Sequence, residues 1–532
     1  MATSTNPDVT LADAAAARGL GAMGAPKGLA RWLWPSLFDI ILVSLPLWFF
    51  GLADGGTGLL LSDGDTGWHI RTGEWILSNH SFVWHDLFSF SKPGGEWFAW
   101  EWLSDVLLAL AHQAAGLRGV ALGGIVLSAL FCGILFRHMV WRGANIFIAL
   151  PLSLMGFGAA TVHLLARPHL FTMVAVAATA WMIQADLRRP GRWIWLLVPV
   201  TTLWTNLHGG WLALIAMLGL TAVGTAMEVL LGAAQWRTVK RYLLLAAACF
   251  AASFVNPYGW KLHLHTAKYL TSSWIKDVVS EFQSPVFRSE NMAQYEILLL
   301  CGCAAVGLAM LRKEFAAPLV VLFWAHSSLQ SARHIPIFVA VGAPLVAEQL
   351  QWLWKRWTEG AKKNSVAAIL DGLSLEAAPG LKRVSLWPWV TLVLVAMQVI
   401  PMPWRSDFPS TRFPVEMVNR HKDLLAGSRI LTEDQWGDYL IYRFYPKTKV
   451  FFDGRTDYYG EDLTKEYQRL LSAEHGYRQL LDKYRFDVVL ARPNWALAAV
   501  LKESKEWRVV ADDKKAILLA RVQPLASVGK SN

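Results

Sequence analysis

Charged residues are scarce in this sequence of 532 residues: Asp, Glu, Lys and Arg make up only 17%, whereas hydrophobic residues make up 54%. A soluble chain would carry about a quarter of its residues as charges. Between Ser36 and Trp404, windows of about 18 or more residues almost free of charge recur, each long enough to cross about 30 Å of hydrocarbon as a helix. From Arg405 onward charges return at ordinary density. The composition excludes a purely soluble protein and predicts a polytopic α-helical membrane domain followed by a smaller soluble domain.

Cysteine is also rare, and all four cysteines lie in apolar windows. This placement excludes a disulfide framework and a cysteine metal site, and it predicts small, buried hydrophobic side chains. The sequence also lacks a Gly-rich phosphate loop, an internal repeat and an evident cleavable signal, so the first apolar run is expected to remain as a spanning anchor. The four residues are Cys132, Cys249, Cys301 and Cys303.

The formal net charge of +10 does not indicate a nucleic-acid partner, because Lys and Arg lie in short connections between the apolar windows. In membrane proteins such residues mark the cytoplasmic side. This rule places the N-terminal tail, residues 1–35, in the cytoplasm, and the apolar windows give about eleven spans in residues 36–404. The expected spans begin near Ser36, Gly119, Ala144, Pro168, Trp193, Gly210, Arg241, Tyr295, Phe315, Ile335 and Leu386.

The segment 103–117 is apolar but short. Counting it as a further span would put every later basic connection outside the cell, so we expect a helix that lies along the membrane interface. The first outer loop then covers residues 53–118 and is long, aromatic and rich in acids.

Residues 405–532 are predicted to form an extracytoplasmic α/β domain, because short strand-like segments alternate with helical ones. This alternation favours a largely parallel sheet, with a hairpin around Asp512 and Asp513 between the last strands. The expected strands are 429–433, 449–453, 486–491 and 508–521, and the expected helices are 414–425, 436–445, 463–484 and 495–503.

Asp63 and Asp65 directly follow the first span, with Gly64 between them. A carboxylate presented in this way suits a general base for an acceptor hydroxyl, or a ligand of a divalent cation. The alternative is structural, since Asp is a preferred cap at the start of a helix. The sequence leaves these alternatives open.

The outer side also collects the other unusual polar residues. Glu101 stands between tryptophans beside an apolar helix, where an unpaired carboxylate is costly. Arg167 and Arg333 suit a phosphate, because a guanidinium grips it with two hydrogen bonds, although an arginine at a span end also snorkels. Asn206 and His208 flank a break between spans and are either turn residues or acceptor contacts. The candidate substrate-binding residues are His69, Glu101, Arg167, His169, Asn206, His208, Glu281, Arg333 and His334.

These motifs together resemble the GT-C membrane glycosyltransferases, the superfamily of oligosaccharyltransferases, protein mannosyltransferases and lipid A aminoarabinose transferases. The likeness covers the layout of most of the chain and is strongest in the motif 63–74. A group of uncharacterised bacterial membrane proteins is similar in further landmarks. These are Asp65-x-x-Trp68-His69, Ala166-Arg167-Pro168, Trp204-x-Asn206-Leu207-His208-Gly209, Asn256-Pro257-Tyr258-Gly259, Glu281, Arg333 and Phe452-Asp453-Gly454-Arg455.

The resemblance implies transfer of a sugar from a polyprenyl phosphate or diphosphate on the outer face of the bacterial inner membrane, with inversion. It implies a carboxylate base at Asp63 or Asp65 and cations for the leaving phosphate at Arg333, with Arg167 and a nearby histidine. The acceptor is a glycan, lipid or protein. No cofactor beyond the lipid-linked sugar is certain, and a divalent cation stays open. The first loop lacks a Pro-Pro pair and the soluble domain a Trp-Trp-Asp motif, which argues against peptide-acceptor recognition like that of the oligosaccharyltransferases.

Two other classes compete with an enzyme. A transporter for a lipid-linked glycan predicts a pseudo-repeat and charges near the bilayer midplane, whereas the polar residues here gather at one face. A non-catalytic scaffold of the cell envelope would place the acids and Arg333 on separate surfaces.

Overall fold

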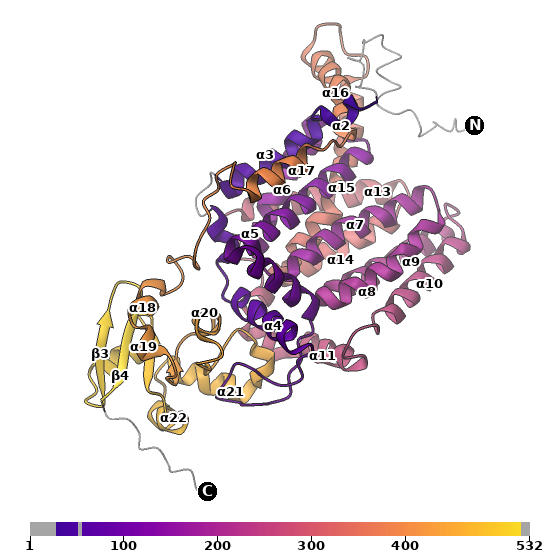
Figure 1. Ribbon diagram of the computed structural model, residues 1–532. Helices are drawn as coiled ribbons and strands as arrows, with labels where there is room; N and C mark the ends of the chain where they lie inside the picture. The colour runs from indigo at the N-terminus through magenta and orange to yellow at the C-terminus, as the bar shows by residue number, and fades with distance from the viewer. Residues whose placement is uncertain (1–27, 52–55, 523–532) are drawn as a thin grey trace.

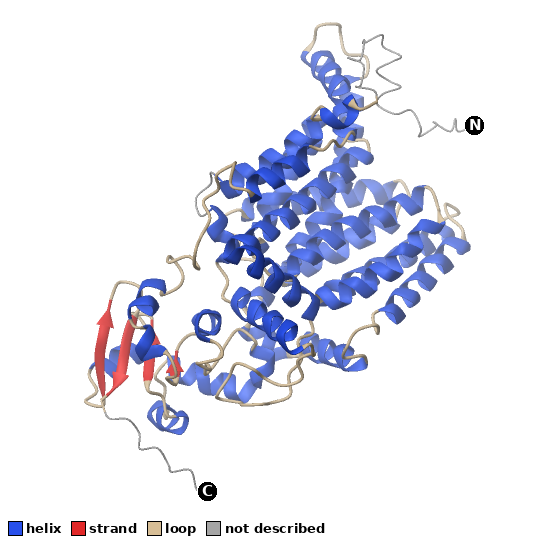
Figure 2. Ribbon diagram, in the orientation of Figure 1, coloured by secondary structure: helices blue, strands red, loops and turns tan. Residues whose placement is uncertain are grey.

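The structure, a computed structural model, describes residues 28–51 and 56–522 as a bundle of long helices with a small mixed region of helices and strands at one end (Figure 1). The predicted N-terminal tail, residues 1–35, lies mostly outside the described residues, as do residues 53–55 at the start of the first outer loop. Helices dominate the bundle, and the strands are confined to the C-terminal part (Figure 2).

Seven helices among the described residues are long and apolar enough to cross a membrane. Each coincides with a window predicted from the sequence, which confirms a polytopic helical fold. They are the stretch Ala30–Gly51, with α2 (Ala30–Leu33) and α3 (Leu37–Gly51), then α5 (Trp102–Trp141), α6 (Ile146–Ala160), α7 (His169–Arg188), α9 (Leu212–Leu230), α13 (Met292–Leu311) and α15 (Ile335–Thr358).

The other four predicted windows fold into shorter helices, so the count of eleven spans is not confirmed. A helix such as α14, with 15 residues, rises about 1.5 Å per residue and is about 22 Å long, less than the hydrocarbon thickness of about 30 Å. All four helices have fewer than 18 residues. They are α8 (Leu197–Leu207), α10 (Trp236–Ala252), α14 (Ala316–Gln330) and α17 (Trp387–Ala396).

Helix α5 changes direction where the sequence analysis separated an interfacial helix from the next span. The backbone leaves the helical region at Ala115 and Gly116, and Gly116 has φ of 61°, which favours glycine. The part before this break packs on α4 (Asp65–Asn79). A β-carbon at Gly73 would lie 2.0 Å from the carbonyl oxygen of Asp105, so α4 approaches α5 this closely because residue 73 is glycine.

The expectation of buried cysteines is right for two residues and wrong for two. Cys132 and Cys249 are buried, whereas Cys301 and Cys303 are exposed on α13. The outer surface of such a bundle is itself apolar, so a small hydrophobic side chain in a predicted span need not face the core.

The C-terminal sheet has the strand order β1-β2-β4-β3 and is mixed. Strand β1 pairs in parallel with β2, but β4 pairs antiparallel with both β2 and β3, so the expectation of a largely parallel sheet is wrong. The predicted hairpin is present and causes this difference, because it returns β4 antiparallel to β3 and inserts it beside β2. The strands are β1 (Ile430–Leu431), β2 (Val488–Ala491), β3 (Trp507–Asp512) and β4 (Ile517–Arg521).

The segment 449–453 is not a strand, contrary to prediction. Only Val450 forms bridges, to Ile430 on one side and to Ser89 of the first loop on the other. The Phe90 N–H donates to the Val450 carbonyl, and the Val450 N–H donates to the Phe88 carbonyl, both at 2.9 Å. The first loop therefore continues the C-terminal sheet. The helices of this part are α18 (Val415–Arg420), α19 (Lys422–Leu425), α20 (Asp434–Phe444), α21 (Thr456–Leu471), α22 (Tyr477–Tyr484) and α23 (Ala496–Lys502).

Helix α20 packs closely on α4, beside the bundle (Figure 1). A β-carbon at Gly64 would lie 2.4 Å from the carbonyl oxygen of Gln435, and one at Gly67 would lie 2.7 Å from that of Asp438. Because backbone atoms cannot move aside as a side chain can, this crossing depends on the two glycines. The C-terminal part thus rests directly on the helix that begins at the acidic motif. The remaining described helices are α11 (Trp260–Thr271), α12 (Ser273–Val278) and α16 (Val366–Lys382).

Candidate active site

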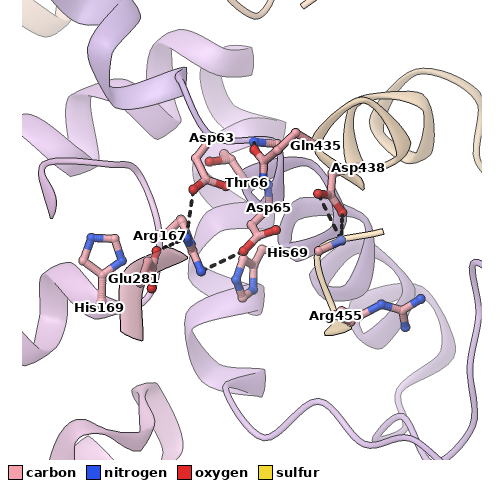
Figure 3. Close-up of polar contacts among 12 residues, drawn as sticks. Asp63, Asp65, Thr66, His69, Arg167, His169, Glu281, Gln435, Asp438 and Arg455 are labelled. Atoms are coloured by element: carbon pink, nitrogen blue, oxygen red, sulfur yellow. Dashed lines mark hydrogen bonds and ion pairs between the residues drawn. The ribbon is translucent and has the colours of Figure 1, made fainter. Parts of the chain in front are cut away.

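Arg167 binds both aspartates of the acidic motif (Figure 3). Its guanidinium lies 2.8 Å from Asp63 Oδ2 and 2.7 Å from Asp65 Oδ2. The other oxygen of Asp63 accepts the backbone N–H of Asp65 at 2.9 Å, at the first residue of α4. Asp63 therefore both supports the start of α4 and pairs with Arg167.

Glu281 extends this ion pair into a chain. It lies in a short 3-10 turn, Ser280–Phe282, of the long connection before α13. Its carboxylate lies 2.8 Å from Arg167 and 3.8 Å from Arg333, whose guanidinium also lies 4.5 Å from the ring centroid of Phe282. The first loop, the start of α7 and the start of α15 are thereby joined, and Arg333 is connected to the aspartates through Glu281 and Arg167 rather than directly.

The two carboxylates Asp65 and Glu281, on either side of Arg167, have opposite shifts in pKa. Burial raises the pKa of Asp65 to about 7, with Asp63 and Glu281 adding to the rise and Arg167 opposing it. Burial also acts to raise the pKa of Glu281, but Arg167 and Arg333 outweigh it and hold that pKa well below its usual range. Asp65 Oδ1 is buried and has no hydrogen-bond partner. Of these two carboxylates, Asp65 is therefore the one that can exchange a proton near neutral pH.

Glu101 lies at the start of α5 between two imidazoles. His208 Nε2 is 3.4 Å from its carboxylate and His69 Nε2 is 3.8 Å away, while His69 Nδ1 lies 2.5 Å from Asp105. Burial raises the pKa of Glu101 to about 8 and lowers that of His208 to about 3. Since burial also lowers the pKa of His69 well below 6.5, both imidazoles are neutral and Glu101 is protonated at neutral pH.

The tautomer of His208 follows from its neighbours. Its Nδ1 accepts the N–H of Gly210 at 3.0 Å and lies 2.8 Å from the Thr172 hydroxyl. The neutral ring therefore carries its proton on Nε2, which faces Glu101.

Three further candidates are held by neighbouring elements and do not join the ion-pair chain. His169 Nε2 donates to the carbonyl of His163 at 2.6 Å, and His334 Nδ1 donates to that of Ser327 at 3.1 Å. Asn206 accepts from the Trp102 indole at 2.7 Å. These contacts fix the ends of helices around the site.

The sequence analysis missed two residues of the C-terminal part that reach Asp65. A β-carbon at Gly454 would lie 2.0 Å from Asp65 Oδ1 and 3.0 Å from Asp438 Oδ2, and the Gly454 N–H donates to Asp438 at 3.0 Å. Gly454 belongs to the landmark Phe452-Asp453-Gly454-Arg455, which gave a signal in the sequence. Asp438 lies on the buried face of α20 among apolar residues, and nothing in its spacing pointed to Asp65.

Metal ligation has little geometric support in the part of the chain that the structure describes: no group of three or more His, Cys, Asp or Glu is placed to hold an ion there. Asp63 and Asp65, which the sequence suggested as possible ligands of a divalent cation, bind the guanidinium of Arg167.

Two solved membrane proteins share this architecture. One is an archaeal oligosaccharyltransferase, AglB from Archaeoglobus fulgidus, in complex with an inhibitory peptide and a dolichol-phosphate, with a TM-score of 0.53 and 12% identity over 87% of this chain and 69% of that one. The other is ArnT from Cupriavidus metallidurans bound to undecaprenyl phosphate, with a TM-score of 0.50 and 13% identity over 92% of this chain and 98% of that one. The chain has the GT-C fold.

Sequence comparison alone does not reveal this fold. No family model matches this chain, and no curated protein matches it in sequence. Within the GT-C fold, the ion-pair chain lies where the C-terminal part meets α4, so that residues of both parts surround Asp65.

Proposed function

We propose that this chain is a membrane glycosyltransferase that moves a sugar from a polyprenyl-phosphate-linked donor to a glycan, lipid or protein acceptor on the outer face of the bacterial inner membrane. The proposal is supported by the GT-C fold and by the polyprenyl-phosphate lipids bound in the two similar structures. The single observation that carries it furthest is the chain Asp65–Arg167–Glu281–Arg333, which joins a carboxylate suited to accept a proton to a guanidinium suited to bind phosphate.

Asp65 is the preferred base. Both oxygens of Asp63 are engaged, one by the Asp65 N–H and one by Arg167, whereas Asp65 Oδ1 has no hydrogen-bond partner. A pKa of about 7 also suits a general base that works near neutral pH. In the proposed step the acceptor oxygen bonds to the sugar C1 while its proton passes to Asp65.

The bond between C1 and the phosphate oxygen breaks in the same step, and the phosphate leaves with its negative charge. Arg333 is the preferred cation for it, because Arg167 is already bound to three carboxylates while Arg333 has one longer ion pair of 3.8 Å with Glu281. The direct attack inverts the configuration at C1. The role of Arg167 is then to hold Asp63, Asp65 and Glu281 in place.

The proposed orientation of the chain in the membrane rests on the charges at the end of the bundle opposite the ion-pair chain. Glu348 of α15 pairs there with Arg142 and with Arg188 at the last residue of α7. Positively charged ends of this kind favour the cytoplasm, which puts the ion-pair chain and the domain 405–532 outside. A reporter fused after residue 532 should be active only as an extracytoplasmic reporter, and cytoplasmic activity would contradict this orientation.

The test is transfer by the full chain reconstituted with labelled polyprenyl-phosphate sugars. Asp65→Asn should lower the rate by about 100-fold or more, as for loss of a general base. Asp277→Asn changes an exposed acid of α12 and serves as the matched control with unaltered transfer. Equal rates in wild type and Asp65→Asn would exclude Asp65 as the base. Absence of transfer from every donor would favour the scaffold, and movement of the donor across the bilayer without product would favour the transporter.

A further inference from the structure

We propose that Asp438 of the C-terminal part and Asp65 of the bundle form an acid pair that shares one proton beside Gly454, so that docking of α20 on α4 sets the protonation of the base. The catalytic consequence rests on the proposed function, whereas the shared proton does not. Asp438 is a positioning residue in this scheme because it acts through Asp65.

The geometry brings the two carboxylates to one point. The β-carbon position of Gly454 is 2.0 Å from Asp65 Oδ1 and 3.0 Å from Asp438 Oδ2, so both oxygens approach the same α-carbon. Figure 3 shows the two side chains facing this loop from different helices. Any side chain at residue 454 would separate them, which explains glycine at this position.

Both carboxylates are withdrawn from water. Asp438 is fully buried and Asp65 is 6% exposed. Asp438 accepts the Gly454 N–H through both oxygens, at 3.0 and 3.2 Å, whereas Asp65 Oδ1 has no protein donor. A proton on either carboxylate would supply the donor that Asp65 Oδ1 lacks.

The surrounding charges favour one proton on the pair. Asp65 faces Arg167, Asp63 and Glu281 together with the Trp68 indole, and Arg167 is shared among three acids. Asp438 faces the carboxylates of Asp65, Asp453 and Asp434, and burial followed by the charge of Asp65 raises its pKa well above 3.8. Two like charges buried together resist double ionisation, so the pair titrates as a unit.

The neighbouring acid Asp453 is neutralised separately. Its carboxylate lies 2.6 Å from Arg455, which also pairs with Asp86 of the first loop at 2.8 Å. Arg455 therefore pairs with Asp453 and Asp86.

The first arm of the test is thermal unfolding of the full chain in detergent from about pH 4 to about pH 8. A pKa raised in the folded state gives stability that is complete below the unfolded value and is lost as pH rises through the folded value. Wild type should therefore lose melting temperature across this range. Asp438→Asn should flatten the loss, and Asp65→Asn should flatten it equally, since either change leaves a single acid.

Asp423→Asn, at an exposed position of α19, is the matched control and should keep the wild-type pH dependence. Parallel profiles for wild type, Asp438→Asn and Asp65→Asn would overturn the shared proton. Two variants are used because either alone could fail to fold.

The second arm is the pH dependence of transfer. Wild type should lose rate as pH falls through about 7, and Asp438→Asn should move this limb at least one pH unit lower, because the like charge that raises the pKa of Asp65 is gone. A purely structural role would lower the rate at every pH without moving the limb. If Asp438→Asn flattened the pH dependence of the melting temperature but left the pH dependence of transfer unchanged, the link to catalysis would be overturned. If wild type showed no transfer, the proposed function would be overturned, and the melting experiment would still test the shared proton.

Discussion

The Arg167 guanidinium and the Glu281 carboxylate form a 2.8 Å ion pair between two segments far apart in the sequence. Arg167 also binds the two aspartates at the start of α4, and Glu281 also lies near Arg333. This single pair therefore joins the proposed base to the proposed phosphate-binding residue. Because each side chain is less than a quarter exposed, the charges depend on one another more than on water.

Arg167→Gln should destabilise the protein. The change leaves three acids, Asp63, Asp65 and Glu281, without their shared cation, and removing one member of a largely buried ion pair costs about 3 kcal/mol or more. The stability of Arg167→Lys should lie between that of wild type and that of Arg167→Gln, because lysine keeps the charge but cannot present two N–H groups in a plane. Chemical unfolding in detergent measures the change.

Arg312→Gln is the control for this experiment, because Arg312 forms only a 3.4 Å pair with Glu314 and both residues are exposed. Such a surface pair contributes about 0–1 kcal/mol. Equal stability of Arg167→Gln and Arg312→Gln would show that the acids at the site do not need Arg167.

Arg333→Gln should weaken binding of undecaprenyl phosphate about 10- to 100-fold, the loss expected for a charge-assisted hydrogen bond of about 1.5–3 kcal/mol. Folding should change little, because the ion pair of Arg333 with Glu281 is long, at 3.8 Å. The measurement is calorimetric titration in detergent with undecaprenyl phosphate, and with undecaprenol as the ligand that lacks phosphate. If Arg333→Gln lowered the affinity for both ligands equally, Arg333 would not recognise the phosphate and would act through the fold.

Most of the membrane part could be predicted from the sequence because a spanning helix leaves a local signature, a charge-free window of the right length. The seven helices of the described residues that are long and apolar enough to cross a membrane all lie in such windows. The same signature does not give the length of a helix, since α14 lies in such a window and is only 15 residues long. Hydropathy reports the surroundings of a helix and not its length across the membrane.

The candidate site was predicted in its local parts and missed in its long-range part. Asp63, Asp65, Arg167 and Glu281 were predicted as members of the group of unusual polar residues on one side of the bundle, and the structure brings them together. Asp438 comes from a helix with ordinary soluble composition, and its approach to Asp65 depends on how α20 packs on α4. A contact across more than 370 positions leaves no spacing pattern.

Glu101→Gln should be well tolerated at acidic and neutral pH, because burial raises the pKa of Glu101 to about 8 and glutamine resembles the protonated acid. A raised pKa means that stability is complete below the unfolded value of 4.5 and is lost as pH rises from there through about 8, so wild type should lose melting temperature across this range and Glu101→Gln should lose less. Glu101→Ala removes the partner of His208 and should destabilise at every pH by about 1–3 kcal/mol. The measurement is the melting temperature of the three proteins at several pH values. If Glu101→Gln and Glu101→Ala lowered the melting temperature equally at acidic pH, Glu101 would not be protonated there.

Gly67→Ala should destabilise the contact between the bundle and the C-terminal part. The new β-carbon would lie 2.7 Å from the carbonyl oxygen of Asp438 and 2.9 Å from Cβ of Tyr442, and a backbone oxygen cannot rotate away. Overpacking of this kind costs about 1–3 kcal/mol. Hydrogen exchange should rise in α20 and in the first turns of α4, and transfer should fall because Asp65 loses its neighbours.

Gly307→Ala is the matched control, since residue 307 also lies inside a helix but its β-carbon would meet nothing within 4 Å. There the same substitution should stabilise by up to about 1 kcal/mol, because alanine loses less conformational entropy in a helix than glycine. The opposite signs of the two changes separate helix propensity from close packing. A stabilising Gly67→Ala would mean that α4 and α20 are farther apart than this crossing requires, and that Asp438 does not reach the proposed base.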